Sequence, residues 1–229
     1  MLATAAFSLA FAAGPAAADP VVVELFTSQG CSSCPPADAN LIRLSERDDV
    51  IALSFGVTYW NYLGWDDTFA RAEFTQRQLT YEGPLGHGGA FTPQMVINGT
   101  HDAIGHDLGE VEGLITDAAA APHQGPALQV EAATLSLSGG VAPAKPADIW
   151  LVSFERGISE IPVARGENRR RVLQIAHAVR SLARIGAWSG RDLRIALPPP
   201  AAGLDSAVLV QAGTGGPIIA AGTVPASNL

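Results

Sequence analysis

The first part of the chain combines apolar runs of strand length with segments of helical spacing. Residues 21–27 and 50–58 are continuous, β-branched apolar runs, which is typical of strands buried on both faces of a sheet. Between them, Ala37, Leu41 and Leu44 recur at helical spacing. A helix that connects two buried strands predicts a βαβ unit with a parallel strand pair.

The pattern then predicts two more helices on either side of a hairpin. A second helix is expected over about residues 68–80, and a third begins at Leu108 and ends near Pro122. Between them, the run at residues 91–97 predicts a strand, which the Asn98-Gly99 turn connects to a returning strand.

Beyond residue 125 the pattern changes to short β-leaning runs divided by Gly, Pro and Ser, at residues 128–137, 148–155, 160–164, 192–197, 207–211 and 217–221. This spacing favours an antiparallel, sandwich-like unit. Residues 169–185 suit both a helix and a strand, and the neighbouring strands favour a long strand. The change in pattern predicts two domains, at residues 19–124 and 125–229.

Composition narrows the class of protein. With 48% hydrophobic and 16% charged residues in 229, the chain is expected to fold. A formal net charge of -8 argues against a nucleic-acid binder, which needs a basic face for phosphates. The charge is uneven: residues 19–125 carry 15 acidic against 4 basic side chains, whereas the rest carry 7 against 10.

The first eighteen residues indicate export. They are apolar or small, carry no charge and end in three alanines, which predicts a signal peptide cleaved after Ala18; because a basic n-region is missing, a start further upstream or a retained anchor are the alternatives. The protein is therefore expected to be periplasmic or secreted. No later apolar run reaches the ~18 residues that a membrane helix needs, so stable membrane insertion is not expected.

The two cysteines lie where the first strand gives way to the first helix. Amide donors and the helix dipole favour a thiolate at a helix N-terminus. Cys31, at the exposed edge, is the expected nucleophile, and Cys34 is close enough to resolve a mixed disulfide. An inert structural disulfide is the alternative. Redox chemistry is favoured because a two-residue spacing closes too small a loop to stabilise the fold much.

Three stretches together resemble a family of secreted bacterial proteins of unknown function with a thioredoxin-like N-terminal domain. They are ELFTSQGCSSCPPAD (residues 24–38), YWNYLGW (59–65) and TPQMVING (92–99). The resemblance implies an α/β thioredoxin-like domain over residues 19–124, followed by a smaller, mainly β C-terminal domain over residues 125–229.

The resemblance also implies roles for residues around the cysteines. Thr92-Pro93 matches the position of a cis-proline that faces the cysteine pair, where the Thr92 backbone would bind a substrate strand. Glu24 falls near a buried acid of thioredoxins and is a possible proton relay, with a salt-bridged or exposed carboxylate as the alternative. Trp60 belongs to an aromatic cluster at residues 59–69, which forms either a hydrophobic lip for a partner or part of the core.

These features predict a thiol-disulfide oxidoreductase that acts on thiols or disulfides of proteins or small molecules, without a cofactor or metal. One alternative is a Cu(I)-binding or copper-delivery module that uses the same cysteines. Another is a binding protein in which the first domain is only a scaffold. His87, His101 and His106 do not follow a metal-ligand spacing, and no phosphate loop or acyl-transfer triad is present.

Overall fold

The structure is a computed structural model that describes residues 19–131, 133–199 and 201–224. The predicted signal peptide lies outside these residues. The first part contains β1 (Val21–Thr27), α1 (Pro35–Ser45), β2 (Val50–Gly56), the short 3-10 helix η1 (Asn61–Leu63), α2 (Ala72–Leu85), β3 (Gln94–Ile97), β4 (His101–Ala103) and α3 (Leu108–Ala120).

These first strands form one sheet with the order β2-β1-β3-β4. β1 and β2 pair in parallel, which confirms the predicted βαβ unit. β3 runs antiparallel to β1 and pairs with β4 across the turn at Asn98-Gly99, so the predicted hairpin is confirmed. Asn98 and Gly99 both have positive φ angles, of 45° and 67°, as such a tight turn requires.

The remaining strands form three antiparallel sheets, with the orders β10-β7-β12-β13, β11-β6-β5 and β8-β9. Their bounds are β5 (Ala127–Glu131), β6 (Thr134–Ser138), β7 (Ala147–Glu155), β8 (Ile158–Pro162), β9 (Val172–Ala176), β10 (Val179–Trp188), β11 (Leu193–Ala196), β12 (Leu204–Gln211) and β13 (Ile218–Val224). The ambiguous segment at 169–185 is therefore β rather than helical. It forms two strands because His177, with a φ of 46°, breaks the run.

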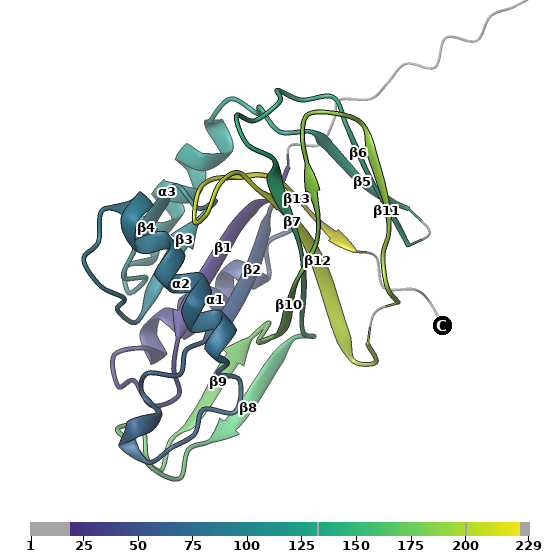
Figure 1. Ribbon diagram of the computed structural model, residues 1–229. Coiled ribbons are helices and arrows are strands. Elements are labelled where there is room, and N and C mark those ends of the chain that lie inside the picture. Colours follow the sequence, from purple (N-terminus) through teal and green to yellow (C-terminus); the bar gives the residue numbers. More distant parts are fainter. Residues whose placement is uncertain (1–18, 132, 200, 225–229) are drawn as a thin grey trace, which may run out of the picture.

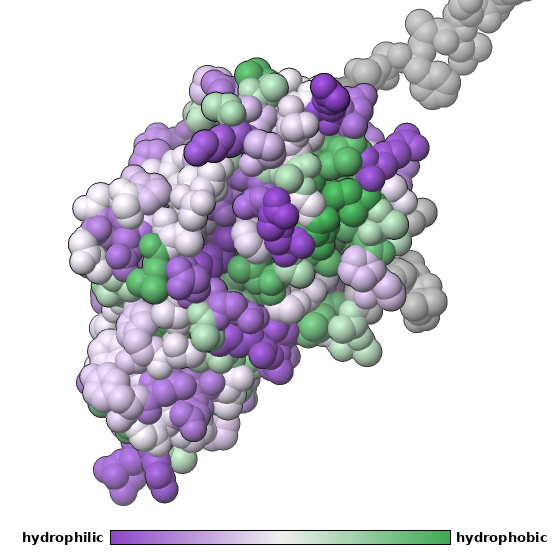
Figure 2. All heavy atoms as spheres, viewed as in Figure 1, coloured by the Kyte–Doolittle hydropathy of each residue, from purple (hydrophilic) through white to green (hydrophobic). Residues whose placement is uncertain are grey.

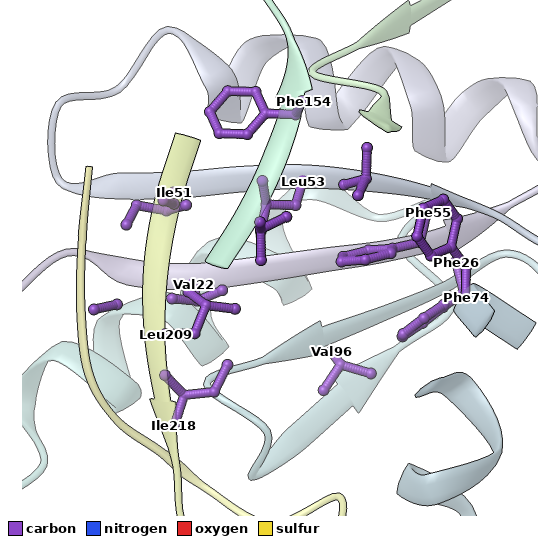
Figure 3. Packing of buried hydrophobic residues seen from close by; sticks show 14 of the residues in the cluster. Val22, Phe26, Ile51, Leu53, Phe55, Phe74, Val96, Phe154, Leu209 and Ile218 are labelled. Atoms are coloured by element: carbon purple, nitrogen blue, oxygen red, sulfur yellow. The ribbon is translucent and has the colours of Figure 1, made fainter. Parts of the chain in front are cut away.

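The two faces of the first sheet are covered by different kinds of structure (Figure 1). On one face, Val21, Val23 and Leu25 of β1 pack against α1 and α3. On the other face, Val22 and Phe26 share one cluster with residues of α2 and of the strands β7, β10, β12 and β13. Figure 3 shows this second cluster, in which the labelled side chains come from both parts of the chain.

The predicted fold class, an α/β thioredoxin-like domain followed by a smaller mainly β domain, is wrong. The described chain is mainly β, with about 39% of residues in strands and 20% in helices, and its strands form four sheets. The physical reason lies in which elements pack on the two faces of the first sheet. Continuous apolar strands require both faces of the sheet to be covered, but the pattern does not say by which elements. Side chains such as Phe154 and Leu209 from distant strands cover one face together with α2.

The β8-β9 hairpin extends to the lower tip of the molecule in Figure 1, beneath the first sheet. Its strand β9 lies against α1 and β2, which places the connection between β8 and β9 near the cysteine segment. None of the helices in the described ranges is long and apolar enough to cross a membrane.

Candidate functional site

Cys31 and Cys34 form a disulfide in the turn between β1 and α1, with their Cα atoms 5.5 Å apart. Cys34 is the N-cap residue of α1, and its carbonyl oxygen accepts hydrogen bonds from the backbone of Ala37 and Asp38. Prolines occupy the first two helical positions. Because proline has no N–H, this helix start has fewer free amide donors for a thiolate than the sequence argument assumed.

The surroundings of the Cys31 sulfur are polar. Its Sγ atom lies 3.3 Å from the Ser33 hydroxyl and 3.9 Å from the backbone oxygen of Thr92. Both cysteines are fully buried, although Ser32 and Ser33 between them are exposed. The expectation that Cys31 lies at an exposed edge is therefore wrong for this disulfide form.

The structure brings the other predicted substrate-binding residues to the same place. The Thr92-Pro93 peptide bond is cis, as the resemblance implied. The indole Nε1 of Trp60 donates a hydrogen bond of 2.7 Å to the Thr92 hydroxyl. The ring of Tyr62 stacks on Trp60 and is 77% exposed. Part of the aromatic cluster thus forms a surface beside the disulfide.

The other part of the aromatic cluster is structural. Phe69 is buried against the β8-β9 hairpin. The Trp65 indole donates to the side-chain oxygen of Gln29, at 2.9 Å. The two alternatives for the cluster, a lip or core packing, therefore apply to different residues within it.

Glu24 occupies a buried ion pair. Its two carboxylate oxygens accept hydrogen bonds of 2.6 and 3.0 Å from the guanidinium of Arg77, and the Tyr81 hydroxyl also donates to it. Burial raises the pKa of Tyr81, so its hydroxyl stays protonated as a donor. Gln211 of β12 accepts a hydrogen bond from Arg77 at 3.2 Å. Of the two predicted alternatives for Glu24, this is the salt-bridged carboxylate.

Asp38 is a second buried acid, which the sequence reasoning missed. It lies four residues after Cys34 on the buried side of α1, and its Oδ1 accepts a hydrogen bond of 2.8 Å from the Thr27 hydroxyl. Burial raises the pKa of Asp38 to about 7, with a smaller contribution from the charge of Asp67, while the Thr27 hydrogen bond acts in the opposite direction. The sequence could have indicated Asp38 through its four-residue spacing from Cys34, which places the two side chains on one helix face.

Asp67 ties the loop after β2 to the cysteine segment. Its Oδ2 accepts a hydrogen bond of 2.7 Å from the backbone of Gln29. Its Oδ1 accepts from the backbone of Phe69 and Ala70, at 2.9 and 3.1 Å. Burial raises the pKa of Asp67, against the lowering effect of these hydrogen bonds. This carboxyl group thus fixes the residues immediately before Cys31.

The connection between β8 and β9 contributes two more residues that the sequence reasoning missed. Asn168 is completely buried, and its side-chain amide donates to the backbone oxygens of Gln29 and Cys31, at 3.1 and 2.8 Å. The carboxylate of Glu167 accepts a hydrogen bond of 2.9 Å from the backbone of Ser32. A segment from the second half of the chain therefore holds the cysteine turn in place.

The three histidines considered as metal ligands lie apart. His87 pairs with Asp102 at 2.8 Å, and His101 contacts Thr100 at 3.0 Å. The Nε2 of His106 donates to the backbone oxygen of Ser33 at 2.7 Å, so this histidine reaches the cysteine segment. Within residues 19–131, 133–199 and 201–224, no group of three His, Cys, Asp or Glu residues is arranged to hold a metal ion.

Comparison with known proteins gives a family and two similar structures. The family described as "Protein of unknown function (DUF1223)" matches residues 22–211. A structural-genomics protein of Agrobacterium tumefaciens is 30% identical, with a TM-score of 0.75 over 93% of this chain and 97% of that chain. HBP35 of Porphyromonas gingivalis is 15% identical, with a TM-score of 0.55 over 92% and 78%, a likeness of fold alone.

A comparison with curated proteins gave no match. The family match and the Agrobacterium structure cover nearly the whole described chain, so they confirm the predicted membership of a family of unknown function, although not its thioredoxin-like first domain. The chain belongs to the DUF1223 family.

Proposed function

We propose that this protein is a thiol-disulfide oxidoreductase that acts through Cys31 and Cys34. The observation that carries the proposal is the position of the Cys31 sulfur, next to the Ser33 hydroxyl and the Thr92 backbone oxygen. In the reduced protein, the hydroxyl can donate to a thiolate, which lowers the energy of the ionised sulfur. The pair also closes a loop too short to serve as a stabilising cross-link.

The reaction follows from thiol-disulfide exchange. The Cys31 thiolate attacks a substrate disulfide, the bond between the substrate sulfurs breaks, and the leaving thiolate takes a proton from water. Cys34 then loses its proton, attacks Cys31 and releases the second substrate thiolate, which is protonated in turn. Two electrons pass to the substrate, and the Cys31–Cys34 disulfide is the product. The reverse sequence oxidises a substrate dithiol.

Asp38 is the proposed proton acceptor for Cys34. It lies on the same helix face one turn later, and its raised pKa of about 7 allows its carboxyl group to gain and lose a proton near neutral pH. Glu24, the acid implied by the family resemblance, is less suited because its carboxylate is already occupied by Arg77 and Tyr81.

Substrate binding is proposed at Thr92, Pro93 and Trp60. The Thr92 backbone oxygen lies beside Cys31, and the exposed Tyr62 next to Trp60 offers an apolar contact for an extended substrate. Because Cys31 is buried in the oxidised form, its surroundings have to open before a substrate sulfur can reach it. The proposed periplasmic or secreted location rests on the sequence of residues 1–18.

The test is a trapping experiment. A Cys34→Ala variant cannot resolve a mixed disulfide, so it should retain substrate proteins or small thiols on Cys31 that a reducing agent releases. The control is Cys31→Ala in the same background, which should retain nothing. If the trap stays empty and the reduced wild-type protein does not react with a neutral disulfide, the redox proposal is wrong.

A further inference from the structure

The connection between β8 and β9 is strongly cationic. Residues 165–171 contain four arginines and one glutamate, which gives +3 within a chain of net charge -8. Arg165 and Arg169 are exposed, and the salt bridges found among the described residues do not include them. Figure 2 shows strongly hydrophilic side chains at the lower tip of the molecule, where this connection lies in Figure 1.

Two of these arginines, Arg165 and Arg169, belong to a segment that is held against the cysteine turn. An open depression on the surface is lined by Leu63 of η1 and by Arg165, Gly166, Glu167 and Arg169. The hydrogen bonds of Glu167 to Ser32, and of the neighbouring Asn168 to Cys31, fix the connection against the cysteine turn. A molecule in this depression therefore lies next to the residue that follows the nucleophile.

The lining indicates the chemistry of the occupant. Arginine side chains bind carboxylates with paired hydrogen bonds, and Leu63 offers an apolar contact beside them. The one carboxylate in the depression, that of Glu167, is already bound by the backbone of Ser32. The local charge of +3 over residues 165–171 attracts an anionic molecule to this patch, against the acidic character of residues 19–125.

Building on the proposed function, we infer that the substrates are thiols or disulfides whose neighbouring groups carry carboxylates, which bind Arg165 and Arg169 while the sulfur reaches Cys31. Such a group can come from an acidic segment of a protein or from a small peptide such as glutathione. Both sources present the same carboxylate chemistry to the two guanidinium groups.

The test compares disulfides of different charge with the reduced protein. The substrates are an acidic peptide disulfide, its analogue with lysine in place of each acidic residue, glutathione disulfide, and the neutral linear disulfide bis(2-hydroxyethyl) disulfide. The test variant is Arg165→Gln/Arg169→Gln. The matched control is Arg191→Gln/Arg194→Gln, which removes the same charge from exposed arginines at β11.

We expect the test variant to lower kcat/KM for the acidic peptide about tenfold, as two exposed ion pairs allow, without changing the rate with the neutral reagent. Added salt should reduce the wild-type rate and change that of the variant little. If the test variant loses kcat/KM with glutathione disulfide alone, the carboxylates come from a small peptide. If it loses kcat/KM with the acidic peptide alone, they come from an acidic protein segment. Equal wild-type rates with the acidic and lysine peptides would overturn the inference.

A second measurement separates this inference from the proposed function. The acidic peptide with serine in place of cysteine is titrated against the oxidised protein, where binding needs no reaction. Charge-dependent binding that the test variant loses supports carboxylate docking at the two arginines even if no turnover occurs. Turnover of the neutral reagent together with absent peptide binding supports the redox activity and rejects the anionic substrate class.

Discussion

The side-chain amide of Asn168 donates a hydrogen bond of 2.8 Å to the backbone oxygen of Cys31, across a sequence separation of 137 residues. The same amide donates to the backbone oxygen of Gln29 at 3.1 Å, and the Asn168 side chain is completely buried. Buried carbonyl groups need a partner, and the Gln29 carbonyl obtains one from the second half of the chain, while the Cys31 carbonyl, which also accepts from the Cys34 backbone at 3.3 Å, obtains a second.

Replacement of Asn168 by alanine should therefore loosen the cysteine turn. The Asn168→Ala variant leaves two buried carbonyls without this donor, and we expect it to lower the free energy of unfolding by about 1–3 kcal/mol. We also expect faster reduction of the Cys31–Cys34 disulfide by a neutral dithiol. Urea denaturation and the rate of thiol release measure these effects. The control Gln174→Ala, which removes an exposed side-chain hydrogen bond to Glu160, should change neither by much.

A second prediction concerns Asp38 and pH. Its ordinary pKa is 3.8, and burial raises it to about 7 in the folded protein. Between these values the folded state binds more protons than the unfolded state, so this group makes the free energy of unfolding fall as pH rises from about 4 to about 7. Asp38→Asn removes the effect. Its stability relative to wild type should therefore increase over this range, by up to about 4 kcal/mol, and then level off.

Urea denaturation of the oxidised proteins across this pH range measures the difference. Asp48→Asn is the matched control because Asp48 is exposed on the loop after α1. The free energy of unfolding of Asp48→Asn should change with pH in parallel with that of the wild type. If the Asp38→Asn curve is also parallel to wild type, the Asp38 carboxyl is not held protonated by the fold, and its proposed role with Cys34 is lost.

The sequence predicted the elements around the disulfide that depend on local patterns. The strands β1 and β2 followed from continuous apolar runs, α1 from the spacing of Ala37, Leu41 and Leu44, and the β3-β4 turn from Asn98-Gly99. The fold class was wrong because a buried face does not indicate what covers it. That cover comes from strands such as β7 and β12, whose side-chain packing against the first sheet leaves no local pattern in the sequence.

The same distinction applies to the candidate site. Cys31, Cys34 and Thr92 lie in short motifs, and the structure brings them together as expected. Asn168 and Glu167 lie in an arginine-rich loop without periodicity, so their contacts with the cysteine turn depend on tertiary packing alone. Their position in the structure is the information that the sequence pattern lacked.

The buried pair of Arg77 and Glu24 gives a third prediction. An Arg77→Met variant leaves the Glu24 carboxylate buried without its cation, which should cost about 3–5 kcal/mol of unfolding free energy. The double variant Glu24→Gln/Arg77→Met should recover part of the loss, because no buried charge remains. By comparison, Arg47→Met removes the surface ion pair with Asp49 and should cost less than about 1 kcal/mol. Additive losses in the double variant would contradict a coupled pair.

The last prediction concerns the charge of Glu167 beside the nucleophile. The Ser32 side chain, and next to it the backbone N–H of Ser32 that donates to this carboxylate, lower the pKa of Glu167, so the group is ionised at neutral pH. A negative charge next to Cys31 disfavours the thiolate. Glu167→Gln keeps an acceptor for Ser32 but removes the charge. It should therefore stabilise the reduced form and make the reduction potential less negative, by less than about 30 mV.

Equilibration with a dithiol buffer of known potential measures this shift. Glu160→Gln is the control, because Glu160 lies on β8 of the same hairpin and its hydrogen bond is to the exposed Gln174. The shift for Glu167→Gln should shrink as salt is added, since the carboxylate is exposed to solvent. A shift to a more negative potential, or an equal shift in the Glu160 control, would show that the Glu167 charge does not act on Cys31.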